Sequence, residues 1–330
     1  MDLVDPQVVI IEEGALSKLD SLLEDRKRSI CVTDDYLLSE YRGALEEELG
    51  ENPTWILVSQ CDKNLSDLRP EGDIILGFGG GRSLDAAKLL ARETGLDWIS
   101  VPTAASHDGI ASDVASVSHN GYRYSEKCKS PIAVLADLSI IAKAPPRLQL
   151  AGIGDIICKS SSLGEWQLAH KEKGERFDDG VFSLVESALK TVLVDDSLEA
   201  LIRAEIDSGK AMRIFGSSRP CSGTEHAISH AMDRGCGELH GLQVGFATPL
   251  CLYFLNQAGY TDYDSESIHD LMVQKRLPTH LHEFSITTEH FLQDISHALN
   301  IMERRNRYSV LHHLDVDDTQ LVGVLKELQY

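Results

Sequence analysis

Three separated groups of residues in this 330-residue chain have types and spacings that suit chemistry. The first is the glycine-rich run GGGRSLD at residues 79–85, the second is the single carboxylate Asp155, and the third comprises His226, His230 and His240. A glycine turn suits a phosphate-bearing cofactor, whereas one carboxylate and several imidazoles suit a divalent metal ion. A dinucleotide and a metal in one chain indicate metal-assisted hydride transfer.

The glycine turn lies between an apolar run, residues 73–78, and a predicted helix over residues 84–92. Glycine lets a ligand approach the backbone closely, and the first amides and the dipole of a helix attract phosphate. The pattern is not GxGxxG, and three glycines after a strand also occur as a simple tight turn. Asp34 or Asp35, at the end of the strand-like run 29–33, is the candidate partner of an adenosine ribose hydroxyl, although acidic residues end many strands.

The histidines are spaced for a common site. His226 and His230 are four residues apart in a predicted helix and therefore share a face, and His240 follows a short loop at the start of the next helix. Asp155 is expected early in a helix, where a carboxylate can turn inward. Catalytic zinc commonly takes three protein ligands and leaves one position open, a count that Asp155 and two of these histidines satisfy. The alternative is that the histidines are ordinary core or surface residues.

Alternating segments in the first half of the chain must position the glycine turn. Helix-like segments separate apolar runs, an alternation that implies a parallel sheet covered by helices. Asn120-Gly121, the preferred two-residue hairpin turn, lies within the alternating residues 114–124. The strand-like runs are residues 8–11, 29–33, 56–58, 73–78, 98–101 and 132–137.

From residue 147 onward the patterns are helical, with segments at 147–170, 180–194, 196–215, 224–234 and 239–256 and a less regular helical tail over 261–330. We therefore expect an α/β fold. Its N-terminal Rossmann-like parallel-sheet domain, residues 1–146, binds the dinucleotide. Its C-terminal all-helical domain, residues 147–330, binds the metal and the substrate. Pro145-Pro146 marks the boundary and can open the next helix.

Bulk properties exclude several classes of function. No apolar run reaches the roughly 18–20 residues that span a bilayer, and the acidic N-terminus lacks the basic start of a signal peptide. The net charge of −21 would repel nucleic acid and anionic lipid. Seven scattered cysteines without a CxxC pair indicate reduced thiols. We expect a soluble cytoplasmic protein with a small-molecule substrate, without nucleic acid partners or membrane insertion.

The motifs resemble those of a known superfamily. GGGRSLDAAK at 79–88 is similar to the GGGxxxDxxK signature of the iron-containing alcohol dehydrogenases, glycerol dehydrogenases and dehydroquinate synthases. PTAASHDG at 102–109 is similar to the segment that follows the next strand there, and Asp155 and the three histidines fall in that superfamily's order. The resemblance covers residues 5–260. Within the superfamily, GGGRSLDAAK, PTAASHDGIAS and GxGDxxxK resemble the archaeal sn-glycerol-1-phosphate dehydrogenase family.

This resemblance implies a fold and an activity. The fold is that of dehydroquinate synthase, with two domains. The activity is the reduction of dihydroxyacetone phosphate to sn-glycerol 1-phosphate, the backbone of archaeal ether lipids. The cofactors are NAD or NADP and Zn²⁺, and the protein is expected to form homo-oligomers.

The resemblance also implies roles for individual residues. Asp155, His226 and His240 would be the zinc ligands, His230 would lie beside them as a proton relay, and Asp108 would contact the substrate. The residues expected to line the dinucleotide are Asp34, Gly79, Gly80, Gly81, Arg82, Ser83, Asp85, Thr103, Ser106 and Ser112.

One position departs from the superfamily pattern. Iron-dependent alcohol dehydrogenases usually carry a histidine four residues after the ligand aspartate, where this chain has Lys159. A lysine ammonium cannot replace a neutral imidazole ligand without losing its proton, but it can attract a phosphate. The change therefore favours three-ligand zinc and a phosphorylated substrate. The alternative for Lys159 is a solvated helix lysine, and Lys127 and Arg213 are weaker candidates for the phosphate.

Three other functions stay open from the sequence. A glycerol or other polyol dehydrogenase would share the cofactor and the metal without the phosphate. A dehydroquinate-synthase-like cyclase is disfavoured because the region around 226–230 is poor in Lys and Arg. A non-catalytic binding protein is disfavoured because all four metal and catalytic positions are present.

Overall fold

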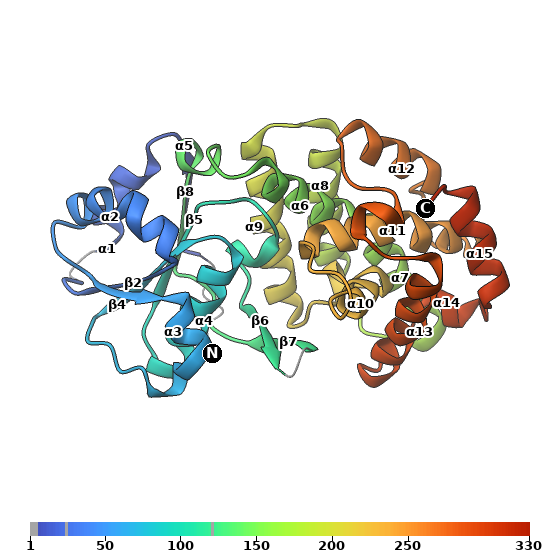
Figure 1. The fold of residues 1–330 in the computed structure, drawn as a ribbon, viewed down its shortest axis with the longest axis horizontal. Coiled ribbons are helices and arrows are strands. Elements are labelled where there is room, and N and C mark those ends of the chain that lie inside the picture. Colours follow the sequence, from blue (N-terminus) through green and yellow to red (C-terminus); the bar gives the residue numbers. More distant parts are fainter. Residues whose placement is uncertain (1–5, 24–25, 120–121) are drawn as a thin grey trace. The chain divides into compact units, whose positions relative to one another are not determined.

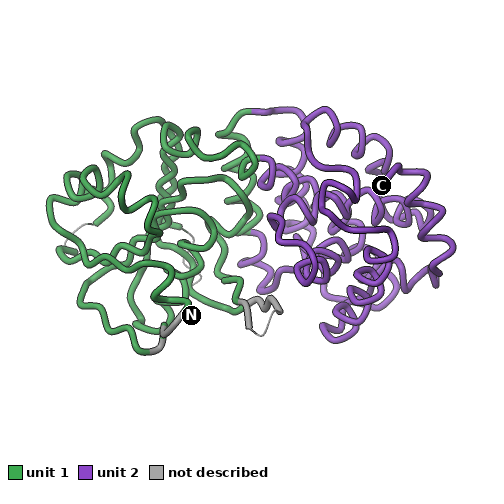
Figure 2. The backbone as a smooth tube through the Cα atoms, viewed as in Figure 1, with its two compact units in different colours: residues 1–117, 124–149, 197–210 green, residues 118–123, 150–196, 211–330 purple. Residues whose placement is uncertain are grey.

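The structure, a computed structural model, describes residues 6–23, 26–119 and 122–330. The chain forms two compact units (Figure 2). Unit 1 comprises residues 1–117, 124–149 and 197–210, and unit 2 comprises residues 118–123, 150–196 and 211–330.

Unit 1 is built on a six-stranded sheet in which every paired strand is parallel, in the order β1-β8-β5-β4-β2-β3 (Figure 1). Strands β2, β4, β5 and β8 are buried along their whole length, as their continuous apolar runs predicted. The strands are β1 (Val8–Glu12), β2 (Ser29–Thr33), β3 (Thr54–Leu57), β4 (Ile74–Gly79), β5 (Trp98–Pro102) and β8 (Ala133–Asp137). The expected α/β fold with a parallel sheet is confirmed.

The remaining elements of unit 1 connect these strands. Helix α4 packs against β4 and β5, and β6 pairs with β7 as the predicted hairpin. The predicted turn Asn120-Gly121 lies outside the described residues. These elements are η1 (Ala15–Lys18), α1 (Leu19–Leu23), α2 (Asp35–Leu49), α3 (Val58–Asn64), η2 (Leu65–Asp67), α4 (Gly81–Thr94), η3 (Asp108–Ile110), β6 (Val114–His119), β7 (Tyr122–Lys127) and α5 (Leu138–Ile141).

The strand order creates a ligand position at the carboxyl ends of β2 and β4. These strands are neighbours, but β2 leads through α2 to β3 on one side, whereas β4 leads through α4 to β5 on the other. In open α/β sheets ligands bind where the strand order reverses in this way. The sheet therefore brings the glycine turn that follows β4 next to Asp34, which follows β2.

Unit 2 is helical, as predicted, but the prediction of one continuous helix over residues 147–170 is wrong. Residues 147–170 form two helices that are interrupted at Cys158, so Asp155 lies near the end of α6 rather than early in a helix. Pro146 does open α6, where its missing amide hydrogen costs nothing. The elements from residue 146 onward are α6 (Pro146–Ile157), α7 (Lys159–Lys173), α8 (Asp179–Val194), α9 (Leu198–Phe215), η4 (Arg219–Cys221), α10 (Thr224–Met232), α11 (His240–Ala258), α12 (Ser265–Gln274), η5 (Leu281–Phe284), α13 (Thr288–Arg304), α14 (Val310–His313) and α15 (Asp318–Glu327).

Glycines let α6 and α11 cross at very short range. A Cβ at Gly241 would lie 2.0 Å from the carbonyl oxygen of Ala151, and a Cβ at Gly154 would lie 2.3 Å from the carbonyl oxygen of Gly241. Both distances are too short for any other residue without moving a backbone. This contact matters for the site because Asp155 follows Gly154 on α6 and His240 precedes Gly241 on α11.

The last seventy residues are part of the core of unit 2. Buried side chains of α13, α14 and α15 join those of α10 and α11 in one apolar cluster, which includes Phe291, Leu311 and Leu325. Among the described residues, no helix combines the length and the apolar composition needed to cross a bilayer.

The two units are not divided at a single position of the chain. Residues 118–123 belong to unit 2, whereas unit 1 includes residues 147–149 and residues 197–210, most of α9. Gly209 of this segment packs so closely on the loop after β5 that a Cβ would lie 2.8 Å from the amide nitrogen of Ser112. Tertiary packing of this kind is not visible in a local sequence pattern.

Candidate functional site

The three glycines of the turn have different reasons to be glycine. Gly79 has a φ of 154°, and a Cβ there would lie 2.4 Å from Oγ of Ser83. A Cβ at Gly81 would lie 2.1 Å from Nε2 of His107. A Cβ at Gly80 would meet no described atom within 4 Å. Packing therefore requires two of the glycines, and the open space at Gly80 fits the approach of a ligand to the start of α4.

Residues of the loop after β5 close around the turn. The amide of Thr103 donates to the carbonyl oxygen of Gly79 at 3.0 Å, which ties this loop to the end of β4. Nδ1 of His107 accepts a hydrogen bond from the amide of Gly109 at 2.7 Å, and the ring lies against Gly81. Ser106 lies half-buried in the same loop. Sequence reasoning missed His107, although it lies inside the matching PTAASHDG segment.

Two predicted cofactor residues, Asp85 and Ser112, are engaged in a buried polar cluster. Nζ of Lys88, which has no exposed surface, lies 3.1 Å from Oδ1 of Asp85 and 3.2 Å from Oγ of Ser112, and it donates to the carbonyl oxygen of Val114 at 2.9 Å. Oδ2 of Asp85 accepts from the amide of Ser116 at 3.1 Å. The D and K of the GGGxxxDxxK signature thus hold the start of β6 on α4, and contact of Asp85 and Ser112 with the dinucleotide stays a prediction.

Arg82 and Asp34 flank the turn. Nη2 of Arg82 lies 2.8 Å from Oδ2 of Asp62 in a highly exposed ion pair, which contributes little to stability. Oδ1 of Asp34 accepts from the amide of Leu37 at 2.8 Å and so caps α2. Asp34 therefore stabilises the start of α2, and its contact with ribose stays a prediction. Asp35 is exposed in the first turn of α2.

Unit 2 brings the predicted metal ligands together. Nε2 of His226 lies 3.9 Å from Oδ1 of Asp155, and the ring centroid of His240 lies 5.1 Å from that of His226. The three side chains come from α6, α10 and α11. Helices α6 and α11 meet at the glycine crossing, and α10 packs against α11. Asp155 and His226 are both buried.

Hydrogen bonds orient both imidazoles. Nδ1 of His226 lies 2.9 Å from Oε1 of Glu225 and donates to it. Ser229 gives its single hydroxyl hydrogen to Oε1 of Gln243, so its oxygen accepts from Nδ1 of His240 at 2.8 Å. Each ring therefore carries its proton on Nδ1 and keeps a lone pair on Nε2, the arrangement that metal-binding histidines use. Sequence reasoning missed Glu225, Ser229 and Gln243.

Cys158 also lies within this group. Asp155, Cys158 and His226 each offer a ligand atom, and these atoms lie within 4.8 Å of one another. However, Sγ of Cys158 is 3.9 Å from Nδ1 of His226, the nitrogen that faces Glu225, and it donates to the carbonyl oxygen of Asp155. The thiol therefore lies beside Nδ1 of His226 and not beside Nε2, the nitrogen that is available to a metal. His240 stays the predicted third ligand.

His230 stands beside the set. Its ring stacks on that of His240 with centroids 5.7 Å apart, one helical turn after His226. It is only half-buried, whereas His226 is buried. Its position agrees with a role next to the metal ligands rather than among them, which stays a prediction.

Lys159 is not a solvated lysine. Its side chain is 0% exposed, and Nζ lies 3.4 Å from Oδ2 of Asp155 and 3.4 Å from the carbonyl oxygen of Cys221. A buried ammonium persists only with anionic or polar partners, so Lys159 places a positive charge directly at the metal set. The weaker phosphate candidates differ. Lys127 is exposed and pairs with Asp113 in unit 1, whereas Arg213 is buried in unit 2 and burial lowers its pKa.

Asp108, the predicted substrate contact, opens η3 in unit 1 and is half-buried. The candidate cofactor residues are likewise part of unit 1, whereas the candidate metal ligands are part of unit 2.

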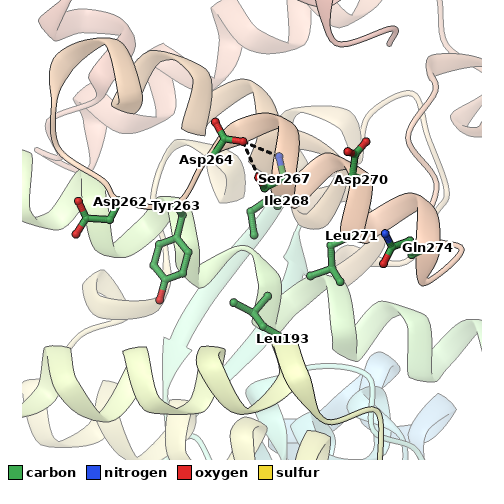
Figure 3. Close-up of a pocket in the computed structure, with 9 residues that line it drawn as sticks. All are labelled: Leu193, Asp262, Tyr263, Asp264, Ser267, Ile268, Asp270, Leu271 and Gln274. Carbon is green, nitrogen blue, oxygen red and sulfur yellow. Dashed lines mark hydrogen bonds between the residues drawn. The ribbon is translucent and has the colours of Figure 1, made fainter.

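A separate hollow in unit 2 contains none of these residues. It has a volume of about 440 Å³ and lies between α8 and α12 (Figure 3). Its floor carries Leu193, Ile268 and Leu271, and Asp264 on its rim accepts hydrogen bonds from the amide and hydroxyl of Ser267 at 2.8 Å. Its shape and its acidic rim do not suit an anionic substrate.

Comparison with known proteins shows the family of the chain. Residues 10–145, which contain the sheet and the glycine turn, match the family "Iron-containing alcohol dehydrogenase". The chain is 33% identical to glycerol-1-phosphate dehydrogenase [NAD(P)+] of Methanosarcina acetivorans over 93% of this chain and 90% of that protein. It is 38% identical to the enzyme of the same name from Natronomonas pharaonis over 74% of this chain and 70% of that protein.

Solved structures agree with the fold. A probable glycerol dehydrogenase from Sinorhizobium meliloti superposes with a TM-score of 0.71 at 22% identity and covers 89% of this chain and 88% of its own. Glycerol dehydrogenase from Schizosaccharomyces pombe superposes with a TM-score of 0.69 at 17% identity and covers 93% of this chain and 94% of its own. At these identities the likeness shows a shared fold.

Proposed function

The chain belongs to the glycerol-1-phosphate dehydrogenases of the iron-containing alcohol dehydrogenase superfamily, and from this premise we propose that it reduces dihydroxyacetone phosphate to sn-glycerol 1-phosphate with NADH or NADPH. The observation that carries the proposal is 33% identity over 93% of the chain to an enzyme of that name. The buried Lys159 beside Asp155 supports a phosphorylated substrate, because a fixed ammonium attracts a phosphate.

We propose zinc as the metal, held by Asp155, His226 and His240. The donor set fits, since it combines one buried carboxylate with two imidazoles whose Nδ1 atoms are engaged by Glu225 and Ser229. Three protein ligands leave a position for the substrate. When bound, zinc would act as a Lewis acid toward the ketone of the substrate and stabilise negative charge on its oxygen.

The chain's own residues would bind and protonate the substrate. Lys159 would hold the phosphate, and Asp108 would contact the substrate. His230, half-buried beside His240, would relay the proton that the product oxygen needs after hydride transfer. Reduction of the ketone to an alcohol takes up one hydride and one proton. The proton must come from a side chain such as His230 or from water.

The cofactor would bind at the switch point of the sheet in unit 1. The open face of Gly80 and the first turn of α4 would take the diphosphate, and Thr103 and Ser106 would line the same end. Asp34 would accept from ribose hydroxyls and thereby disfavour a 2′-phosphate. When bound, the nicotinamide supplies the hydride.

Turnover with paired substrates tests the proposal. NADH oxidation by the zinc-loaded protein would be followed with dihydroxyacetone phosphate and with unphosphorylated dihydroxyacetone. We expect turnover with the phosphate and far less without it. Turnover with dihydroxyacetone alone would make the protein a polyol dehydrogenase, and no oxidation with either would overturn the assignment. We also propose a homo-oligomer, as the resemblance implies, which light scattering on the purified protein tests.

A further inference from the structure

The first turn of α10, the helix that carries His226 and His230, begins on a buried polar cluster. We call this the α10 cluster, and its members come from four parts of unit 2 that lie far apart in sequence. All of them are 5% exposed or less, and they are Ser161, Glu165, Arg219, Thr224, Glu225 and Ser309. Two carboxylates without exposed surface are costly unless hydrogen bonds and charges compensate them.

Glu225 is compensated by groups that include the metal ligand itself. Its Oε1 accepts from the amide of Gly223 at 2.6 Å and from Nδ1 of His226 at 2.9 Å, and its Oε2 accepts from Oγ of Ser161 at 2.9 Å. A carboxylate oxygen accepts hydrogen bonds, so the imidazole of His226 presents an N–H at Nδ1 to Glu225.

Glu165 lies in the same cluster and has a different set of contacts. Its oxygens accept from the amide of Thr224 at 2.8 Å, from the hydroxyl of Thr224 at 2.5 Å and from the amide of Val310 at 3.0 Å. Oγ of Thr224 also lies 2.7 Å from Oγ of Ser309. Burial raises the pKa of Glu165 although the guanidinium of Arg219 opposes this. Glu165 thus ties the C-terminal segment to the start of α10, and these hydrogen bonds do not involve His226.

The two carboxylates come from different helices, since Glu225 precedes His226 on α10 whereas Glu165 lies on α7. Gly223 has no room for a side chain, since its Cβ would lie 2.6 Å from Oε2 of Glu165 and 2.9 Å from Oε2 of Glu225. The two carboxylates therefore flank the helix start at close range. Because Glu225 holds Nδ1 of His226, the ring cannot turn to offer that nitrogen, and Nε2 stays directed at Asp155.

We propose that Glu225 is a positioning residue that fixes the tautomer and the ring orientation of His226 and so sets the affinity of the site for a divalent metal. The inference rests on the proposed function, in which His226 is a metal ligand. A carboxylate that accepts from the second nitrogen of a ligand imidazole makes the coordinating nitrogen more basic. Loss of such a partner typically costs about 10–100-fold in metal affinity.

The test compares Glu225→Gln with Glu165→Gln. The first variant keeps the shape and one acceptor on Nδ1 but removes the charge, whereas the second neutralises the neighbouring carboxylate of the same cluster. Zinc dissociation constants would be measured by competition with a chromophoric chelator, and the visible absorption of the cobalt-substituted proteins would report ligand geometry. We expect Glu225→Gln to bind zinc about 10–100-fold more weakly, with an altered cobalt spectrum, and Glu165→Gln to bind like the wild type.

The outcomes separate the inference from the proposed function. Glu225→Gln with wild-type zinc affinity and an unchanged cobalt spectrum would overturn the positioning role. Equal losses in Glu225→Gln and Glu165→Gln would also overturn it, because they would reflect the cluster as a whole. If the wild-type protein bound no metal, or if His226→Ala kept full affinity, the ligand assignment itself would fail. Should Glu225→Gln not fold, Ser161→Ala removes one donor to Oε2 of Glu225, and unchanged zinc affinity in that variant would count against the inference.

Discussion

At the scale of single residues, the most consequential side chain is a lysine with no exposed surface. Lys159 lies one helical turn after Asp155, where a helix lysine would ordinarily reach water. Nζ lies beside the carboxylate of Asp155, and the proposed function assigns it to an anionic group of the substrate. The positive charge of Lys159 would favour the binding of a phosphate and disfavour the binding of a metal cation nearby.

Replacement of Lys159 by methionine separates these effects. We expect Lys159→Met to raise the KM for dihydroxyacetone phosphate about 10–100-fold, since hydrogen bonds to charged groups contribute about 1.5–3 kcal/mol. Zinc affinity should stay equal or increase. Steady-state kinetics and chelator competition measure the two quantities, with Lys190→Met, an exposed lysine paired with Glu186, as the control. An unchanged KM with weakened zinc binding would contradict the phosphate role.

Substitution of Gly80 tests whether this residue lies on the surface that binds the dinucleotide. An added methyl group meets no described atom within 4 Å, so Gly80→Ala should lower thermal stability only slightly, since alanine is less favourable than glycine at the N-cap of α4. A diphosphate at the helix start would meet that methyl group. We therefore expect NADH affinity, measured by fluorescence titration, to fall about tenfold or more, as one lost contact of about 1.4 kcal/mol implies. Gly43→Ala on α2 is the matched control, and equal NADH affinity in both variants would exclude Gly80 from the binding surface.

At the scale of elements, the crossing of α6 and α11 sets the distance between Asp155 and His240. Helix packing at glycine contacts is shorter than side-chain packing, and here backbone lies on backbone. The interruption at Cys158 also matters, because it ends α6 just after Asp155 and lets α7 start at Lys159. The glycine crossing brings Asp155 of α6 close to His240 of α11. The interruption at Cys158 brings Lys159 of α7 close to Asp155.

A single methyl group at this crossing should damage the site. In Gly241→Ala the new Cβ would overlap the carbonyl oxygen of Ala151, and overpacking of this kind costs about 1–3 kcal/mol. We expect a lower denaturation midpoint together with weaker zinc binding. Gly323→Ala in α15, where a Cβ meets no described atom within 4 Å, should leave zinc binding unchanged and slightly raise the denaturation midpoint, because alanine is the better helix former. Retention of wild-type zinc affinity in Gly241→Ala would show that the crossing does not control the ligands.

Asp137 makes the sheet unit sensitive to acid. This buried carboxylate ends β8 and accepts from the amides of Gly14 at 3.1 Å, Leu16 at 3.0 Å and Ser139 at 3.0 Å. Burial by itself would raise the pKa of Asp137, but its hydrogen bonds outweigh that effect and lower the pKa. A lowered pKa means that the ionised group stabilises unit 1 above the unfolded value of about 3.9, and that this stabilisation is lost as the pH falls below it.

Asp137→Asn should therefore destabilise unit 1 at neutral pH by about 1–3 kcal/mol, and the difference from the wild type should shrink below about pH 4. Urea unfolding can be followed by tryptophan fluorescence in a Trp166→Phe background, because Trp55 and Trp98 then report on unit 1. A difference that stays constant between pH 7 and pH 3 would show that the ionised form of Asp137 has no special role.

At the scale of the whole molecule, the net charge of −21 works against the proposed substrate. A phosphate dianion is repelled at long range, although the buried Lys159 attracts it at short range. Salt screens charges separated by more than a Debye length of about 10 Å at 0.1 M, and it screens buried pairs much less.

The KM for dihydroxyacetone phosphate should accordingly decrease as salt is added. Between about 0.01 M and 0.15 M ionic strength we expect a fall of about two- to fivefold, because long-range repulsion is screened first. The KM for a neutral ketone such as dihydroxyacetone provides the control and should stay constant. A KM for the phosphate that rises with salt would indicate that attraction by surface cations dominates the encounter.

The sequence by itself determined the features that depend on local periodicity. Alternating apolar runs predicted the parallel sheet, the glycines predicted a turn at the end of β4, and the four-residue spacing placed His226 and His230 on one face of α10. Side-chain spacing along one element is a property of backbone geometry, and it is therefore readable without the fold.

Only the tertiary structure decided the contacts between elements distant in the chain. It buried Lys159 against Asp155, broke the predicted long helix at Cys158, and placed Ser161 of α7 on Glu225 of α10. It also tied the tail, a segment without a recognised motif, to α10 through the hydroxyl groups of Ser309 and Thr224. Such contacts depend on how helices pack and on which buried charges find partners, and these are properties of the assembled core rather than of any stretch of sequence.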